Sequence, residues 1–320
     1  MPFRHRFKWT RPLNEFFLTH STKRYARIHK VNNPILWMGI GHFRYRMENV
    51  FGEALTVYDV QDKHGAKSRY ISDATTRLVR DYEEYASRRA DVLFTTHPEL
   101  KNDLEKCNNN IHVIPNGVEA ELLEELKYKD NEIPSDISEI PRPRLGYLGS
   151  IRPKIDFSCL LHLAQARPSY HIVLIGQNVL NDLLSVPIFE QLLMQPNVHY
   201  LGPRPRESTA QYVNAFDVAV YPLMRNDYCA YMDPNKVVLY LAAALPVVML
   251  KQRLPLVHEQ FINVAECYED FVEKVDGAVN APDHIMVEKG RRHAETLSWE
   301  SLVEKMLSII GETYYRKYNK

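Results

Sequence analysis

The stretch Asp233-Pro-Asn-Lys-Val-Val-Leu-Tyr-Leu-Ala-Ala-Ala-Leu-Pro-Val-Val248 predicts a helix start, a buried helix and a buried strand in immediate succession. Asp233 is a good N-cap because its carboxylate can accept from the free N–H groups of a first turn, and Pro234 suits the first helical position. Residues 237–244 are apolar nearly all round, so the helix is expected to be buried. Residues 245–250 are typical of a strand covered on both faces, as in a parallel sheet.

Lys236 occupies the first turn of this expected helix, where the positive end of the helix dipole disfavours a cation. An anion bound between the lysine ammonium and the free N–H groups of the turn would explain its presence, and phosphate is an anion that helix starts bind. The alternative is a well-capped core helix with a surface lysine. Spacing alone leaves both interpretations open.

Length and composition indicate a soluble globular protein of about two domains. The chain has 320 residues, of which 45% are hydrophobic and 25% charged, and its formal net charge is zero. A neutral balance argues against a general nucleic-acid binder. No apolar run approaches the roughly 20 residues of a membrane span, and no signal peptide is visible.

Cysteine usage points to a reducing compartment. The four cysteines are scattered, and none forms a Cys-x-x-Cys pair: Cys107, Cys159, Cys229 and Cys267. Neither a zinc site nor a disulfide framework is indicated, so we expect no metal and a cytoplasmic location.

Charge is concentrated at the N-terminus. Residues 1–30 carry eight Lys or Arg against the single acid Glu15, a net charge of +7. Aromatic residues are interleaved with these charges: Phe3, Phe7, Trp9, Phe16, Phe17 and Tyr25. Basic and aromatic residues together suit an anionic membrane surface, and so predict a peripheral contact. A solvated helix face or the edge of a groove for an acidic ligand are the alternatives.

Strands and helices alternate twice along the chain, which predicts an α/β fold with parallel sheets. The first series has expected strands at 33–39, 54–59, 90–96 and 111–114 and helices at 21–30, 73–89 and 98–106. The second has strands at 144–148, 170–175, 197–201, 216–222, 245–250 and 261–265 and helices at 156–166, 206–215 and 283–296, before a last helix capped by Ser298. Residues 119–143 are expected to form a helix and an interdomain linker.

Two groups of polar residues are placed where chemistry can occur. Asp59, Asp62 and His64 follow the strand at 54–59, although acids in such positions also cap helices. In the second series Gly149, Gly176, Gly202 and Pro222 end strands, with Arg152, Lys154, Arg204 and Lys236 nearby. Glycine turns admit a ligand close to backbone N–H groups, and cations around them suit a diphosphate. The absence of Gly-x-Gly-x-x-Gly and Walker motifs argues against NAD binding and ATP hydrolysis.

The order of these motifs resembles bacterial glycosyltransferases of the GT-B fold, close to the retaining family-four group. The resemblance covers residues 54–310 and rests on Val113-Ile-Pro-Asn-Gly-Val-Glu119, Leu145-Gly-Tyr-Leu-Gly-Ser150, Val173-Leu-Ile-Gly176, Asn197-Val-His-Tyr-Leu-Gly202, Phe216-Asp-Val-Ala-Val-Tyr-Pro222, Pro234-Asn-Lys236, Tyr240-Leu-Ala-Ala243, Pro246-Val-Val248 and Ser298-Trp299. Tyr58-Asp-Val-Gln-Asp62 makes the chain most similar to cell-surface polysaccharide and teichuronic-acid-type enzymes.

This resemblance implies two Rossmann-like domains. Residues 1–135 would form a shortened acceptor-side domain, 136–298 the nucleotide-sugar domain, and 299–320 a helix that crosses back to the first domain. The activity implied is retaining, metal-independent hexosyl transfer from a nucleotide-diphosphate sugar to a lipid-linked or polysaccharide acceptor, with no cofactor beyond the donor.

The resemblance also implies roles for particular residues. Lys236 and Arg152 would stabilise the departing diphosphate, while Gly149 and Ser150 offer backbone donors. Gln177, Arg204 and Tyr221 would lie near the base and ribose. The helix start would line the donor site through Asp233, Pro234, Asn235, Lys236 and Val237. Our own candidate for the polar group that faces the sugar is Asp62, with Asp59 and His64 behind it.

Three positions depart from the family pattern. Tyr231 and Leu239 stand where the family has two glutamates, the second of which binds the ribose hydroxyls, and Ala244 stands in place of a glycine. A catalytically silent GT-B module that binds a partner or glycan is therefore the alternative function. A nucleotide-sugar epimerase is a third interpretation.

Overall fold

The structure is a computed structural model that describes residues 10–39, 49–63, 73–128 and 132–319. The chain forms two compact units, one of residues 1–115 with 304–320 and the other of residues 116–303. Each contains a parallel sheet, which confirms the α/β fold class. Residues 116–135, expected in the first domain, belong to the second unit because helix α4 (Ala120–Lys127) packs against α8 (Thr209–Asn214) and α9 (Asn235–Ala242).

In its described residues, the first unit has a four-stranded sheet of order β1-β2-β3-β4. These strands are β1 (Ile35–Met38), β2 (Leu55–Val60), β3 (Val92–Thr95) and β4 (Ile111–Val113), and the helices are α1 (Thr10–Ile28), α2 (Asp73–Arg89) and α3 (Pro98–Leu104). The last helix of the chain, α12 (Trp299–Tyr318), ends in this unit, where Lys317 pairs with Asp91 at 2.9 Å. Helix α1 begins eleven residues before the predicted start at Ser21.

The second unit has strand order β10-β9-β8-β5-β6-β7 in the part of the chain that is described. The strands are β5 (Arg144–Leu148), β6 (His171–Ile175), β7 (Val198–Gly202), β8 (Val218–Tyr221), β9 (Val247–Leu250) and β10 (Asn263–Ala265). This is the order of a doubly wound Rossmann sheet, in which winding reverses between β5 and β8. Ligands of such sheets bind beyond the carboxyl ends of the strands at the point of reversal.

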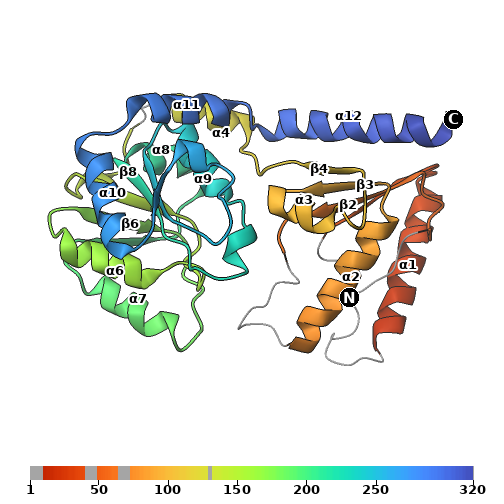
Figure 1. The fold of residues 1–320 in the computed structure, drawn as a ribbon, viewed down its shortest axis with the longest axis horizontal. Helices are drawn as coiled ribbons and strands as arrows, with labels where there is room; N and C mark the ends of the chain where they lie inside the picture. The colour runs from red at the N-terminus through yellow and green to blue at the C-terminus, as the bar shows by residue number, and fades with distance from the viewer. Residues whose placement is uncertain (1–9, 40–48, 64–72, 129–131, 320) are drawn as a thin grey trace. The chain divides into compact units, whose positions relative to one another are not determined.

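Two groups of helices flank this sheet. Helix α6 (Phe157–Ala166) packs against α7 (Ser185–Leu193) and α10 (Tyr268–Asn280), whereas α9 packs against α4 and α11 (His284–Glu295) (Figure 1). The short helix α5 (Ser135–Ser138) precedes β5. Helices α7 and α10 were not predicted, because their N-cap residues, Leu184 and Cys267, are not among the common helix-starting types.

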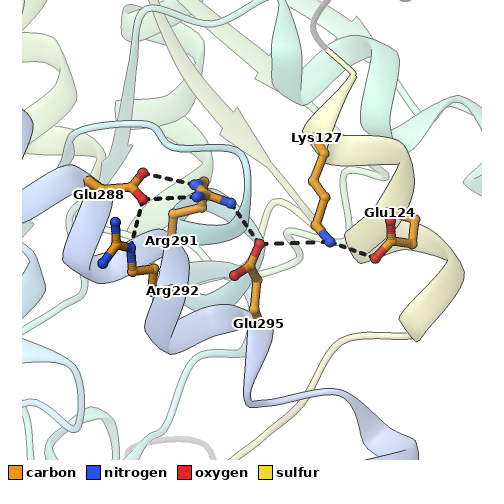
Figure 2. Close-up of polar contacts among 6 residues, drawn as sticks. All are labelled: Glu124, Lys127, Glu288, Arg291, Arg292 and Glu295. Atoms are coloured by element: carbon orange, nitrogen blue, oxygen red, sulfur yellow. Dashed lines mark hydrogen bonds and ion pairs between the residues drawn. The ribbon is translucent and has the colours of Figure 1, made fainter.

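The apolar residues that follow Lys236 are buried, as the sequence predicted. Val237–Ala242 of α9 and Val247–Leu250 of β9 are all buried. The expected cap of α12 is confirmed too, since the Ser301 N–H donates to Ser298 Oγ at 3.1 Å. Outside the core, six charged residues join α11 to α4 by ion pairs (Figure 2).

Of the helices in the described residues, none combines the length and apolar character that crossing a membrane requires.

Candidate donor site in the second unit

Glycines continue the pairing of the sheet beyond the strand ends. Gly149, after β5, donates its N–H to the Ile175 carbonyl at 2.7 Å, and Gly176, after β6, donates to the Gly202 carbonyl at 2.9 Å. The φ angles of Gly149 and Gly176 are +148° and +144°, which side chains disfavour. A Cβ on Gly176 would also overlap the Gly149 carbonyl. Neither glycine has a side chain of its own to cover the backbone at the carboxyl edge of the sheet.

Lys236 lies across one of these glycines. A Cβ added to Gly149 would overlap Cε of the Lys236 side chain, so α9 and the end of β5 meet there. Burial, and then the positive charges of Lys154 and Arg152, lower the pKa of Lys236 to about 8. Among the described residues, no carboxylate pairs with its ammonium group. A half-buried cation beside two others, without an acidic partner, is a favourable environment for an anion.

Two adjoining hollows open at this edge, and both are lined by Leu148 and Gly149. The first hollow is also lined by Ser150, Gln177 and Arg204, and the second by Asn235 and Lys236. Their cavity volumes are about 190 and 180 Å³. Tertiary structure therefore brings together six of the candidate donor-site residues: Gly149, Ser150, Gln177, Arg204, Asn235 and Lys236.

Arg204 is held in the wall of the first hollow by neighbouring side chains. It donates to the Asp136 carboxylate at 2.6 Å through Nη2 and to the Tyr212 hydroxyl at 2.9 Å through Nε. Burial raises the pKa of Asp136, but the hydrogen bonds from Arg204 and Tyr212 outweigh it and keep that pKa below its usual value. The guanidinium charge is already compensated, so Arg204 offers a positioned planar group rather than a free cation.

Asp233 does not cap α9, which corrects the prediction from the sequence. The N-cap is Pro234, whose extended backbone directly precedes the first helical residue, Asn235, and no side chain caps the helix. The Asp233 carboxylate instead accepts from the Asn116 N–H at 2.6 Å, and the Asn116 side chain donates to the Asp233 carbonyl at 2.6 Å. Asp233 thus ties the turn before α4 to the start of α9.

The other oxygen of Asp233 faces a histidine pair. Asp233 Oδ1 lies 3.3 Å from His258 Nε2, and His258 Nδ1 lies 3.2 Å from His293 Nε2. Burial and the neighbouring His258 lower the pKa of His293. Asp233 and His258 are buried and Asn116 and His293 are half-buried, and we call these four residues the buried cluster. Sequence reasoning missed it because its members are far apart along the chain and share no motif.

Several predicted site residues lie away from the lining of both hollows. The Tyr221 and Val237 side chains are 0% and 1% exposed, and the Tyr221 ring packs against Tyr147. Pro234 is buried, and Arg152 is exposed beside the site. Tyr221 on β8 and Val237 on α9 are both buried in the core, which explains why neither lines the hollows.

The acidic candidates belong to the first unit. Asp59 lies on β2, and burial raises the pKa of its carboxyl group although hydrogen bonds with Trp37 and Gln61 oppose the shift. Asp62 follows β2 and is half-buried. His64 lies outside the described residues.

The structure adds residues that the sequence did not single out for a role. Glu119, Leu122 and Trp299 line the second hollow, and Thr209 and Tyr212 line the first. Glu119 and Trp299 belong to the motifs Val113–Glu119 and Ser298-Trp299, so the resemblance contained a signal for both. Leu239, at the position where the resemblance led us to expect a glutamate, lines the second hollow and is 7% exposed.

Comparison with solved structures defines the fold as that of GT-B glycosyltransferases. Sucrose-phosphate synthase from Thermosynechococcus elongatus superposes with a TM-score of 0.74, at 14% identity over 99% of this chain and 82% of that one. HepE from Anabaena, in complex with UDP and glucose, gives 0.65 at 14% identity over 92% and 81%. S. aureus TarM, in complex with fondaparinux, alpha-GlcNAc-glycerol and UDP, gives 0.64 at 13% identity over 90% and 57%.

Among sequence relatives, the chain is similar to TuaH of Bacillus subtilis (strain 168), a protein assigned as a glycosyltransferase of teichuronic acid biosynthesis. The two are 27% identical over 276 residues, which span 80% of this chain and 66% of TuaH. No protein-family model matches the chain. The expected resemblance to GT-B, teichuronic-acid-type enzymes is confirmed.

Proposed function

We propose that the protein transfers a sugar from a nucleotide-diphosphate donor to a lipid-linked or polysaccharide acceptor in cell-surface glycan synthesis. The observation that carries this proposal is the position of Lys236, which lies across Gly149 beside two further cations and lines a hollow at the reversal point of a Rossmann sheet. The similarity to TuaH and the UDP complexes of HepE and TarM support it.

In the proposed mechanism, Lys236 stabilises the leaving group. Negative charge grows on the diphosphate as the glycosidic bond breaks, and a cation already in place lowers the barrier without rearrangement. Arg152 and Lys154 add to the same positive field. We propose that this field suffices without a divalent metal and that the sugar keeps its anomeric configuration, as the family resemblance implies. Activity in EDTA and NMR of the product linkage test these two points.

Lys236→Met tests the central assignment. Removing one group that stabilises developing charge typically lowers kcat about 100- to 1,000-fold, so the rate of transfer should fall by about 100-fold or more. Lys251→Met is the matched control, because Lys251 is exposed and pairs with Glu266 in the same unit. Transfer at the wild-type rate by Lys236→Met, in a folded sample, would remove the assignment.

Asp62 is our proposed polar group on the sugar side, with Asp59 behind it. Both come from the Tyr58–Asp62 segment at the end of β2, where ligands of parallel sheets bind. Asp62→Asn should then lower kcat more than it changes the Kd of the nucleoside diphosphate. Equal losses in both quantities would argue for a structural role.

We also propose that the protein acts on the cytoplasmic face of a membrane, bound peripherally through residues 1–30. Helix α1 exposes Phe16, Phe17, Tyr25 and Ile28 in a segment rich in Lys and Arg. Co-sedimentation with vesicles of anionic lipid, but not of neutral lipid, is the expected result. Equal sedimentation with both would contradict it.

A catalytically silent binding module is the second candidate, and the apolar Leu239 in the second hollow favours it. Such a module should neither hydrolyse nucleotide sugars nor gain thermal stability from nucleoside diphosphates. A screen of UDP, GDP, ADP and CMP by thermal shift separates the two, because a ligand at 100 times its Kd adds about 2.7 kcal/mol of stability.

A further inference from the structure

Glu119 is an acidic side chain in the wall of the hollow that holds Lys236. It directly precedes α4, and its carboxylate makes no capping hydrogen bond to that helix. Among the described residues that line this hollow, Glu119 is the one acid and Lys236 the one cation. Leu122, Leu239 and Trp299 supply apolar surface between polar groups.

The backbone that carries Glu119 is held firmly. Val118 donates its N–H to the Leu297 carbonyl at 3.0 Å and accepts from the Trp299 N–H at 3.0 Å. Gly117 packs so closely that a Cβ there would lie 2.8 Å from the Leu297 carbonyl oxygen. The backbone position from which the Glu119 side chain extends is therefore fixed beside the hollow.

The ion pair that Glu119 makes does not prevent this use. Its partner, Arg206, is 71% exposed, and the Glu119 side chain is 42% exposed. Ion pairs between exposed groups are weak, and a carboxylate has about four lone-pair sites, so it can accept further hydrogen bonds while Arg206 stays near.

A nucleoside diphosphate presents two kinds of group to this hollow. Its phosphates need a cation, and its ribose carries two neighbouring hydroxyl groups that a carboxylate can bind together. Leu239 lines the same hollow and has no acceptor to offer. We propose that Glu119 binds the ribose hydroxyls of the donor and so supplies the carboxylate that α9 lacks; this inference rests on the proposed function.

The test compares a ribonucleotide with its deoxygenated analogue. The Kd of wild-type protein for UDP, GDP, ADP and CDP is measured by calorimetry, and the tightest of them is compared with its 2′,3′-dideoxy form. Wild type should prefer the ribonucleotide by about tenfold, the scale of a hydrogen-bonded charge. Glu119→Gln should bind the ribonucleotide about tenfold more weakly and bind the dideoxy form as wild type does.

Arg206→Gln is the matched control, since it breaks the same ion pair but keeps the carboxylate, and its affinity for the ribonucleotide should not fall. Three results would overturn the inference. In Glu119→Gln the affinity for both nucleotides could fall equally, or Arg206→Gln could lose as much affinity for the ribonucleotide as Glu119→Gln does. The third is that Glu119→Gln binds the ribonucleotide as tightly as wild type. The last of these leaves the proposed function standing. Failure of wild type to bind any of the four nucleotides would overturn both.

Discussion

Two polar assemblies connect helices of the second unit. One consists of buried or half-buried side chains, and the other consists of exposed or half-exposed ion pairs. The buried cluster ties the turn at Asn116 to the start of α9, with the Asp233 and His258 side chains 0% and 2% exposed. Figure 2 shows the other assembly, which joins α4 to α11 through six exposed or half-exposed charged residues: Glu124, Lys127, Glu288, Arg291, Arg292 and Glu295.

The comparison shows that burial, not the number of charges, decides how much a polar contact matters. Water and salt screen the exposed network, and its residues find water when a partner is lost. Polar groups beside the buried Asp233 and His258 side chains have less access to water, so a lost partner leaves them with more of the desolvation penalty. We therefore expect a substitution in the buried cluster to lower the free energy of unfolding more than a substitution in the exposed network does.

The largest effect is expected at Asp233. Asp233→Ala leaves the Asn116 N–H without its acceptor and removes the carboxylate that faces the His258 ring, so the free energy of unfolding should fall by about 2–4 kcal/mol. Urea denaturation measures this change. Asp227→Ala is the control, because Asp227 is an exposed partner of Arg253. Similar losses in the two variants would refute the contrast between buried and exposed contacts.

A substitution at Lys236 should raise the free energy of unfolding instead, because its charge is half-buried and pairs with no carboxylate of the described residues. A pKa of about 8 in the folded protein, below the usual lysine value, means that folding disfavours the charged form. Stability from this group is therefore present at high pH and is lost as pH falls toward 8. Lys236→Met should raise the free energy of unfolding at pH 7 by about 1–3 kcal/mol while it lowers transfer by about 100-fold or more.

Denaturation of wild type and Lys236→Met across pH 7 to 10 measures this effect. The gain in stability should shrink as pH rises, since wild type then loses the unfavourable charge. A loss of stability at pH 7 would show that the ammonium group is part of the fold rather than of the site.

A change in stability of intermediate size is expected at the C-terminal end of α9, where one residue has a left-handed backbone conformation. Ala244 has φ +52° and donates to the Leu241 carbonyl at 2.9 Å, while Leu245 donates to the Tyr240 carbonyl at 3.1 Å. These bonds form a Schellman motif, whose left-handed position favours glycine. Ala244→Gly should therefore stabilise the protein by about 0.5–1 kcal/mol in urea denaturation. Destabilisation would mean that the Ala244 methyl group contributes packing.

The smallest effect is expected in the exposed network. Lys127→Gln removes the contact to Glu295 that links α4 to α11, at 3.7 Å. The urea midpoint should move less than in Ala244→Gly, and the difference should vanish in 0.5 M NaCl because salt screens exposed charges. A salt-independent loss as large as that of Asp233→Ala would overturn the ranking.

Local pattern predicted most elements of the second unit because each depends on nearby residues. The strand at 144–148 and the apolar helix after Lys236 follow from hydrophobic period, and the start of α12 follows from the Ser298 hydroxyl. The same reasoning failed at α7 and α10, whose starts lack a common cap residue. It also failed at Asp233, whose type suits a cap but whose carboxylate is taken by a residue 117 positions earlier.

The sequence by itself determined that glycines end the strands β5, β6 and β7 and that a lysine begins a buried helix, because turn chemistry and periodicity are local. Only the tertiary structure decided that Lys236 lies across Gly149, that Glu119 shares its hollow, and that Tyr221 is buried in the sheet. These relations depend on strand order and helix packing, which bring distant residues together and which no window of sequence contains.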